Sequence, residues 1–238
     1  RFSRGSSASS WAGPASNDVG LARYGRSEWM TIILAGTPCV AMAVAAGWWP
    51  VAIVLGIVLL GMLSFFRDPW RSLPTSLPKG SMVSPADGTI SAIDRVDDHV
   101  ATGGPAIIIR IFLSVLNVHV NRAPCDSTVV GLEYVPGRFL DARTEKSALV
   151  NESNLITLRT GEGECIGVRQ VSGSLARRIV CQPVVDDVLE QGQRIGMIKF
   201  GSTTELILPR PDDVEVLVQV GDAVRGVTTA LAVLPEAS

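Results

Sequence analysis

Apolar and polar positions divide the chain into three parts. Residues 1–28 are rich in Ser, Gly and Arg and lack apolar periodicity, so they predict a flexible tail. Residues 29–66 carry no charged side chain over 38 positions, which is too long for one helix across a hydrocarbon core of about 30 Å. Residues 67–238 alternate short apolar runs with Gly, Pro and Asp. We therefore expect a tail, a hydrophobic segment and a folded body.

The hydrophobic segment predicts a helical hairpin. Gly47-Trp48-Trp49-Pro50 combines a helix breaker with two aromatics that favour membrane interfaces, and it leaves a run of about 17 residues on each side. Cationic residues flank the segment at both ends, whereas the predicted turn has none, so both flanks are expected in the cytoplasm at the cell (inner) membrane. Because each half is short and Pro38 interrupts the first, a hairpin that inserts without crossing, or a buried hairpin of a soluble protein, stays open.

The body of the chain predicts a β-rich (α+β) domain over residues 67–238. Its apolar runs are short, rich in Val, Ile and Leu, and bounded by turn signals such as Asp87-Gly88, Pro136-Gly137 and Gly221-Asp222. We expect a barrel-sandwich-like arrangement of short strands with a few short helices, preceded by the hairpin. The strands are expected over residues 106–113, 127–134, 154–159, 164–171, 194–200, 205–208, 215–220 and 226–233.

Composition narrows the classes of function. The formal net charge is −2 and aromatic residues make up 5% of the chain, so a nucleic-acid partner is not expected. The four cysteines form no CxxC pair and no cluster with histidine, so we predict neither a metal site nor a disulfide framework. A reducing compartment fits this pattern best.

One feature of the body resembles carrier domains. Residues 187–196 and 219–226 are similar acidic turns, and Lys199 stands between them as the modified lysine does in lipoyl or biotinyl carriers. The Met-Lys-Met or Asp-Lys-Ala setting of those carriers is missing, so Lys199 is predicted to be an ordinary exposed strand lysine.

The candidate chemistry centres on Gly201-Ser202. In a tight turn, the serine hydroxyl can attack the preceding carbonyl and replace the amide by an ester, although a polar turn is the commoner meaning of such a pair. Asp87 and His119 stand in other loop segments, and an acid, an imidazole and a hydroxyl form the familiar proton relay. The second histidine, His99, lies in a charged turn and is expected to be solvated.

Seven motifs occur in order over residues 65–209: FFRDP (65–69), SPADG (84–88), LNVHVNRAP (116–124), PGRF (136–139), NESN (151–154), ARRIVC (176–181) and FGST (200–203). Together they closely resemble the short bacterial and archaeal branch of the phosphatidylserine decarboxylases, which are self-processing pyruvoyl enzymes.

The resemblance implies a proenzyme that cuts itself. Ser202 would become the pyruvoyl cofactor, and cleavage after Gly201 would give chains 1–201 and 202–238 that stay associated. Asp87 would assist self-cleavage by holding a histidine.

The resemblance also leaves one division of labour open. His119 matches the first of two histidines in the longer bacterial branch, but Arg122 stands at the position of the second. Either His119 serves both maturation and decarboxylation, or Arg122 or a water covers part of the work.

The implied reaction is a carboxy-lyase step of phospholipid biosynthesis, from phosphatidylserine to phosphatidylethanolamine. The pyruvoyl group would accept the electrons left by CO2, and His119 would return a proton to the substrate carbon. Arg177 and Arg178, with Arg122, are candidate partners of the lipid phosphate, although two surface arginines beside a strand are as plausible. The hairpin would place the domain at the bilayer, and a homo-oligomer is possible.

Three alternatives remain at this point. The same chemistry could act on an archaetidylserine-type lipid, or on a soluble amino acid, against which the hairpin argues. The chain could instead be a membrane-tethered, non-catalytic β-sandwich carrier or assembly module. Self-cleavage between Gly201 and Ser202 separates the enzyme from the module, because a module has no reason to cut its own chain.

Overall fold

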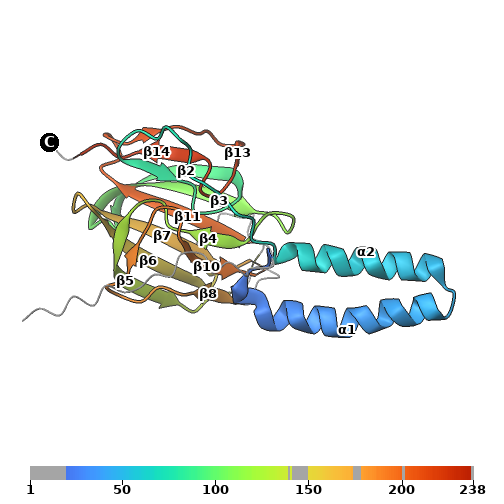
Figure 1. Cartoon of the computed structure of the whole chain (residues 1–238). Coiled ribbons are helices and arrows are strands. Elements are labelled where there is room, and N and C mark those ends of the chain that lie inside the picture. The colour runs from blue at the N-terminus through green and yellow to red at the C-terminus, as the bar shows by residue number, and fades with distance from the viewer. Residues whose placement is uncertain (1–19, 139, 141–149, 174–177, 200–201, 237–238) are drawn as a thin grey trace, which may run out of the picture.

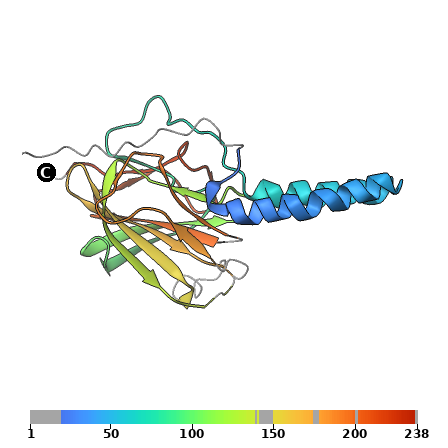
Figure 2. The ribbon, with the colours of Figure 1, turned by 60° about the horizontal axis from the view of Figure 1, so that its bottom comes forward.

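The structure is a computed structural model that describes residues 20–138, 140, 150–173, 178–199 and 202–236. Two long helices project together from one side of a strand-rich body (Figure 1). The second view shows both helices leaving the body on the same side, with the strands of the curled sheet beyond their base (Figure 2). The predicted β-rich body preceded by a helical hairpin is confirmed.

The hairpin consists of a short 3-10 turn and two α-helices. The 3-10 turn is Arg23–Gly25, helix α1 is Arg26–Ala45 and helix α2 is Trp49–Phe65. The chain reverses at Gly47, whose φ of +72° is favourable for glycine, and Pro50 lies in the first turn of α2, where its missing N–H costs nothing. The break therefore falls where the sequence predicts it.

The two helices pack closely and expose apolar side chains around their outer surface. A Cβ atom at Gly36 would lie 2.7 Å from the Leu59 side chain, so glycine permits this close packing. The helices are about 30 and 26 Å long at 1.5 Å per residue. One helix in the described part of the chain, Arg23–Ala45, is long and apolar enough to cross a membrane, and α2 is shorter at 17 residues.

The body is built from antiparallel strands. Their bounds are β1 Ser81–Val83, β2 Gly88–His99, β3 Gly104–Leu113, β4 Val120–Arg122, β5 Ser127–Val135, β6 Ser153–Thr160, β7 Cys165–Val171, β8 Ile179–Cys181, β9 Val188–Leu189, β10 Arg194–Ile198, β11 Ser202–Pro209, β12 Glu215–Val216, β13 Ala223–Val224 and β14 Ala230–Val233.

Three sheets share these strands. The large sheet has the order β13-β2-β3-β11-β7-β6-β5-β9, and two three-stranded sheets have the orders β1-β14-β12 and β4-β10-β8. Strand β11 occupies a central place, with eight residue pairs to β3 and five to β7. All eight of its residues are buried. In the neighbouring β3, Ala106, Ile107, Ile108 and Ile109 are all buried, and burial on both faces explains this continuous apolar run.

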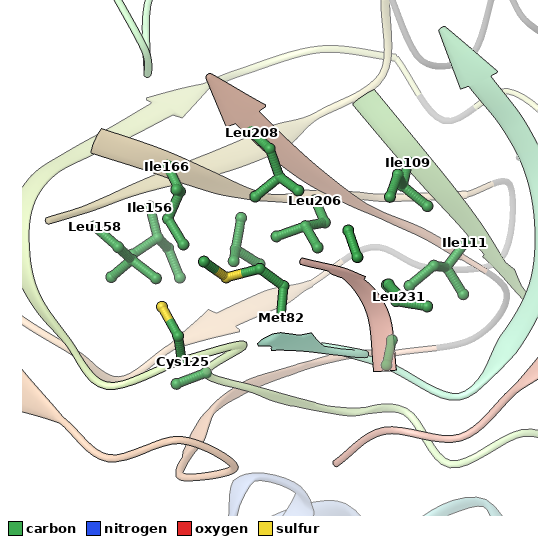
Figure 3. Packing of buried hydrophobic residues seen from close by; sticks show 14 of the residues in the cluster. Met82, Ile109, Ile111, Cys125, Ile156, Leu158, Ile166, Leu206, Leu208 and Leu231 are labelled. Atoms are coloured by element: carbon green, nitrogen blue, oxygen red, sulfur yellow. The ribbon is translucent and has the colours of Figure 1, made fainter. Parts of the chain in front are cut away.

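The core lies between the curled large sheet and the small sheet of β1 and β14. Met82 and Leu231 from the small sheet point toward Ile109, Leu206 and Ile156 of the large one (Figure 3). A second, smaller cluster covers the opposite face of the large sheet and includes residues of β3, β6 and β11. A third cluster fixes the base of the hairpin against β4 and β10.

Several sequence expectations need correction. Six described strands lie outside the predicted runs: β1, β2, β4, β8, β9 and β13. Strand β2 is missing from the predicted strands because its outer half carries aspartates on an exposed edge, which hides the apolar alternation. Ser202 begins a strand rather than standing in a turn, and β11 therefore starts three residues before the predicted run. Lys199 is buried rather than exposed, because it pairs with Glu28 of α1. The predicted boundaries at residues 28 and 66 stay predictions.

Candidate functional site

The described part of the site begins at Ser202. Its side chain is fully buried, and its hydroxyl has no hydrogen-bond partner among the residues that the structure describes. The β7–β11 register pairs Thr203 with Val171, so Ser172 lies opposite Ser202, and its hydroxyl is likewise buried without a partner in the described residues. A buried hydroxyl without a hydrogen bond is unfavourable, so both hydroxyls can still accept a hydrogen bond from a further polar group or donate one to it. Gly201 lies outside the described residues.

His119 is a fully buried imidazole whose tautomer is set by the backbone. Its Nδ1 lies 3.0 Å from the carbonyl oxygen of Asn117, and because a carbonyl only accepts, Nδ1 carries the proton. Nε2 is then the nitrogen that can take up a proton. Desolvation lowers the pKa of His119 to about 4, and the Asn117 hydrogen bond and the charge of Asp87 oppose that shift only in part. The Phe65 ring, at the end of α2, packs against the imidazole with centroids 4.3 Å apart.

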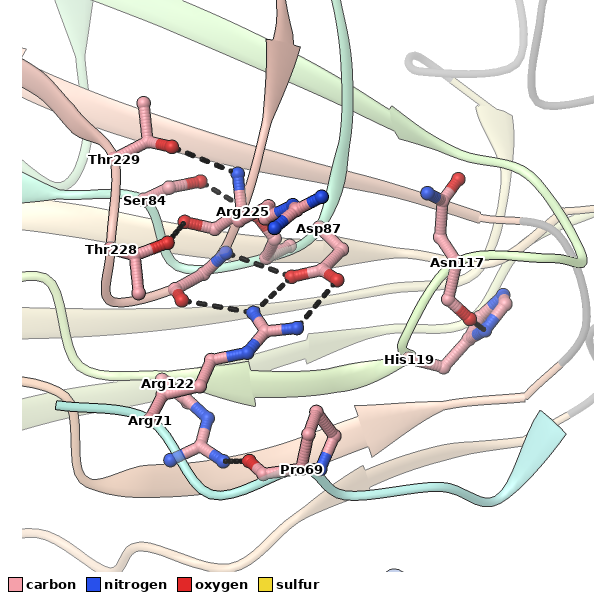
Figure 4. Close-up of polar contacts among 12 residues, drawn as sticks. Pro69, Arg71, Ser84, Asp87, Asn117, His119, Arg122, Arg225, Thr228 and Thr229 are labelled. Atoms are coloured by element: carbon pink, nitrogen blue, oxygen red, sulfur yellow. Dashed lines mark hydrogen bonds and ion pairs between the residues drawn. The ribbon is translucent and has the colours of Figure 1, made fainter. Parts of the chain in front are cut away.

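Asp87 is held by an arginine that the sequence analysis did not single out. Both carboxylate oxygens accept hydrogen bonds from Arg71, one of them at 2.7 Å, and one also accepts from the N–H of Gly226 at 2.8 Å (Figure 4). A Cβ atom at Gly88 would lie 2.2 Å from the carbonyl oxygen of Phe112, so glycine is required for this turn to approach β3. Asp87 acts on the imidazole through its charge, and the idea that it holds a histidine stays a prediction.

The three candidate residues gather at one end of the large sheet. Ser202 pairs with Leu113, the last residue of β3. Asp87 directly precedes β2, which pairs with the same end of β3. The turn that follows β3 leads into His119, and α2 packs on that imidazole. This end of the sheet is therefore the end from which the hairpin leaves.

A buried chain of hydrogen-bonded amide side chains links the strands that carry the site. Asn121 donates to the Thr204 hydroxyl at 2.9 Å and accepts from Gln170 at 2.9 Å, and Asn154 donates to Gln170 at 3.3 Å. Asn121 and Thr204 each lie two positions after a candidate catalytic residue. The chain thus ties β4 to β11, β7 and β6 and fixes the strands that carry both residues.

Arg122 is engaged in a buried ion-pair cluster. Its guanidinium donates to Asp68 at 2.7 Å and to the Gly192 carbonyl at 3.1 Å, and Arg194 donates to the other oxygen of Asp68. Burial lowers the pKa of Arg122, whereas the Asp68 carboxylate opposes that shift. Arg122 also lines a cavity of about 240 Å³ together with other polar and aromatic residues, among them Trp70, Arg71, Glu190, Gln193 and Arg194.

Of the other two predicted phosphate partners, the structure describes one, and it is not part of this cluster. Arg177 lies outside the described residues, and Arg178 is exposed, with its carbonyl accepting from the Lys199 N–H at 3.3 Å. The Lys199 ammonium in turn pairs with Glu28 in the first turn of α1. The segment that leads to the predicted cleavage position is therefore tied to the hairpin, and this buried lysine does not suit a carrier.

Sequence reasoning missed Phe65, Asp68, Arg71 and Glu28. Phe65 and Asp68 belong to the FFRDP motif, and the motif could have indicated that they lie at the site. Nothing in the sequence indicates that Arg71 pairs with Asp87. Among the described residues, no group of three or more His, Cys, Asp and Glu side chains could hold a metal ion.

Comparisons with known proteins agree with the motifs. A family model described as phosphatidylserine decarboxylase matches residues 59–232. A phosphatidylserine decarboxylase proenzyme of Rhodopirellula baltica is 41% identical over 214 residues, covering 88% of this chain and 86% of that protein. Proteins of the same name from Symbiobacterium thermophilum and Nitrosomonas eutropha are 44% and 42% identical, and cover 83% and 84% of this chain and 91% and 90% of their own lengths. The resemblance inferred from the motifs is confirmed.

Proposed function

The chain belongs to the phosphatidylserine decarboxylase family, and from that premise we propose that it converts phosphatidylserine to phosphatidylethanolamine with a pyruvoyl group made from its own Ser202. The observation that carries the cofactor assignment is the buried Ser202 hydroxyl, which has no hydrogen-bond partner in the described structure and stands at the start of a central strand. Its neighbourhood holds a neutral imidazole and a carboxylate.

Self-cleavage uses atoms that the chain itself supplies. The Ser202 hydroxyl attacks the carbonyl carbon of Gly201, and the peptide bond is replaced by an ester while the amine of Ser202 is released. A base then removes the Cα proton of Ser202, and elimination frees the Gly201 carboxylate and leaves a dehydroalanine. Addition of water and loss of ammonia give the pyruvoyl group. His119 suits the role of base, because its Nε2 lone pair is unprotonated at neutral pH.

The described residues fit such a group. A carbonyl oxygen at position 202 can accept a hydrogen bond, and the buried Ser172 hydroxyl opposite it has no partner among the described residues. When present, the pyruvoyl group provides the electron sink that decarboxylation of an amino acid needs. His119 then moves a proton at Nε2, with its ring held by the Asn117 carbonyl and the Phe65 side chain. The Asp87 charge favours the protonated imidazole in that step.

The hairpin supports a position at the bilayer. Its outer surface is apolar, one of its helices is long enough to span, and its base packs against the end of the sheet that carries the site. With cations at the base and none in the turn, the positive-inside rule favours a cytoplasmic body at the inner membrane. A diacyl substrate is met at that surface, and this favours a phospholipid over a soluble amino acid.

The first test is the denaturing intact mass of the purified full chain. We expect two species, 1–201 and 202–238, the second with a ketone in place of its amino terminus. Ser202→Ala should give one uncut mass and no release of CO2 from phosphatidylserine vesicles. Ser127→Ala is the matched control, because Ser127 is a buried serine that begins a different strand, β5, and donates to the Cys125 carbonyl. Normal turnover by Ser202→Ala would overturn the assignment, and an uncut wild-type chain without turnover would favour the non-catalytic module.

A further inference from the structure

The turn between β3 and β4 presents two apolar side chains to the outside. Val115 is 48% exposed and Leu116 is 77% exposed at the tip of the turn Ser114–Asn117. The turn is internally braced, since the Asn117 N–H donates to the Ser114 carbonyl at 2.9 Å and the Asn117 side chain accepts from both the N–H and the hydroxyl of Ser114. This bracing holds the Val115 and Leu116 side chains in their exposed positions at the tip.

The tip is fixed beside the base of the hairpin. Arg67 lies two residues after the end of α2, and its guanidinium donates both to the Leu116 carbonyl and, at 2.8 Å, to the Ser64 carbonyl in the last turn of α2. The turn after β3 reaches out on the side from which the hairpin leaves (Figure 1). The opposite end of β3 adjoins the turn that contains Val100, about 33 Å away along a ten-residue strand.

We propose that Val115 and Leu116 insert into the lipid surface next to the hairpin and form a second membrane contact of the body. This inference rests on the proposed membrane position of the hairpin. The Leu116 carbonyl already accepts a hydrogen bond from Arg67. The tip can therefore enter the lipid surface without losing a hydrogen bond to water at that oxygen. Exposed Arg26 and Arg178 lie at the same base and suit an anionic phospholipid surface.

The contact has a consequence for the site because the turn leads directly to His119. Asn117 closes the turn through its side chain and holds the imidazole through its carbonyl at 3.0 Å. Insertion of the tip would therefore bring the segment that holds the imidazole to the membrane surface.

The experiment is quenching of a fluorescent label by nitroxide lipids in nanodiscs that contain phosphatidylcholine and phosphatidylserine. Labels are attached to the full chain through Leu116→Cys, Val100→Cys or Ile57→Cys. Cys125 stays in place, because it is buried and desolvation raises the pKa of its thiol to about 12. The other native cysteines are replaced by serine: Cys39, Cys165 and Cys181.

We expect strong quenching at position 116 and at position 57 on α2, and little at position 100. Quenching at 57 without quenching at 116 would overturn this inference and leave the hairpin in the membrane. Absence of quenching at both 57 and 116 would overturn the membrane position as well. Equal quenching at 100 and 116 would also overturn the inference, because the contact would then not be specific to the turn.

Activity gives a second measurement that does not depend on labels. Leu116→Asp should lower kcat/KM on phosphatidylserine vesicles about tenfold, since the tip can no longer enter the lipid. The same variant should act normally on a short-chain phosphatidylserine dissolved as monomers. Val100→Asp, at the far end of the strand, should match the wild type on both substrates. Equal losses of Leu116→Asp on vesicles and monomers would overturn the inference.

Discussion

Protonation of His119 should destabilise the fold by an amount that the structure allows us to state. The imidazole is buried and its pKa is about 4, whereas an unfolded histidine has a pKa of about 6.5. Above pH 6.5 both states are neutral at this position. As the pH falls below 6.5, the unfolded state binds a proton that the folded state does not, so stability is lost until about pH 4. The loss attributable to His119 is about 2 kcal/mol at pH 5 and about 3 kcal/mol at the acidic limit.

The assay compares thermal unfolding at pH 7.5 and pH 5 in the arrested proenzyme, Ser202→Ala, with and without His119→Asn. Asparagine keeps an N–H for the Asn117 carbonyl and removes the titration. The melting temperature of the variant that retains His119 should fall about 4–8 °C further between the two pH values than that of the variant without it. Contributions of carboxylates and of His99 are common to both and cancel. Equal pH dependence in the two proteins would refute the reasoning.

If His119→Asn folds poorly, titration of the His119 imidazole resonance tests the same prediction independently. The chain contains only two histidines, so the imidazole resonances of the arrested proenzyme can be assigned with His99→Gln. The His119 resonance should not titrate above pH 5, because desolvation disfavours the charged form. A midpoint near 6.5 would contradict the burial argument directly.

Three further outcomes are expected. Asp68→Asn should lower the stability by about 3–5 kcal/mol in thermal or urea unfolding, because Arg122 and Arg194 lose the carboxylate that they share in a buried position. Glu28→Gln should slow the appearance of the two cleaved chains on denaturing gels several-fold relative to wild type, since Lys199 loses its partner on α1, and Glu28→Asp should restore part of the rate. The cleaved chains should elute as one species in mild detergent and separate only under denaturing conditions, whereas their separation in mild detergent would contradict the strand order described above.

The sequence could predict the elements that depend on local patterns. The uncharged run and the Trp-Trp-Pro break predict the hairpin. The run around Ile109 predicts β3, because burial on both faces requires a nearly continuous apolar sequence. Strand β2 was not predicted, since its outer half lies at an exposed edge and lacks a clear apolar alternation. Ser202 was expected in a turn because its small polar side chain has no strand preference, and only its pairing with β3 places it in the sheet.

The candidate site divides in the same way. Ser202, His119 and Asp87 could be named from motifs, because each stands in a recognisable ordered segment. The residues that hold them in place could not be named from the sequence, since Arg71 contacts Asp87 and Phe65 contacts His119 only in the folded structure. Arg122 illustrates the limit most clearly. Its position in the motif suggested that it binds the lipid phosphate. Whether its guanidinium can bind a phosphate depends on its other partners in the fold, and its partner Asp68 lies 54 residues away in sequence.

The central place of β11 in the large sheet also determines whether the protein can refold after it has unfolded. Before cleavage, one continuous chain brings β11 between β3 and β7, so refolding after a transient opening is unimolecular. After the proposed cleavage, the same strand would belong to a 37-residue fragment, and its loss would leave two sheet edges unpaired in the middle of the core. Recapture would then require two dilute molecules to meet before either aggregates. A protein cleaved in this way would therefore be protected by the slowness of its unfolding and not by its ability to refold, and its lifetime in the cell would be set by the first complete unfolding event.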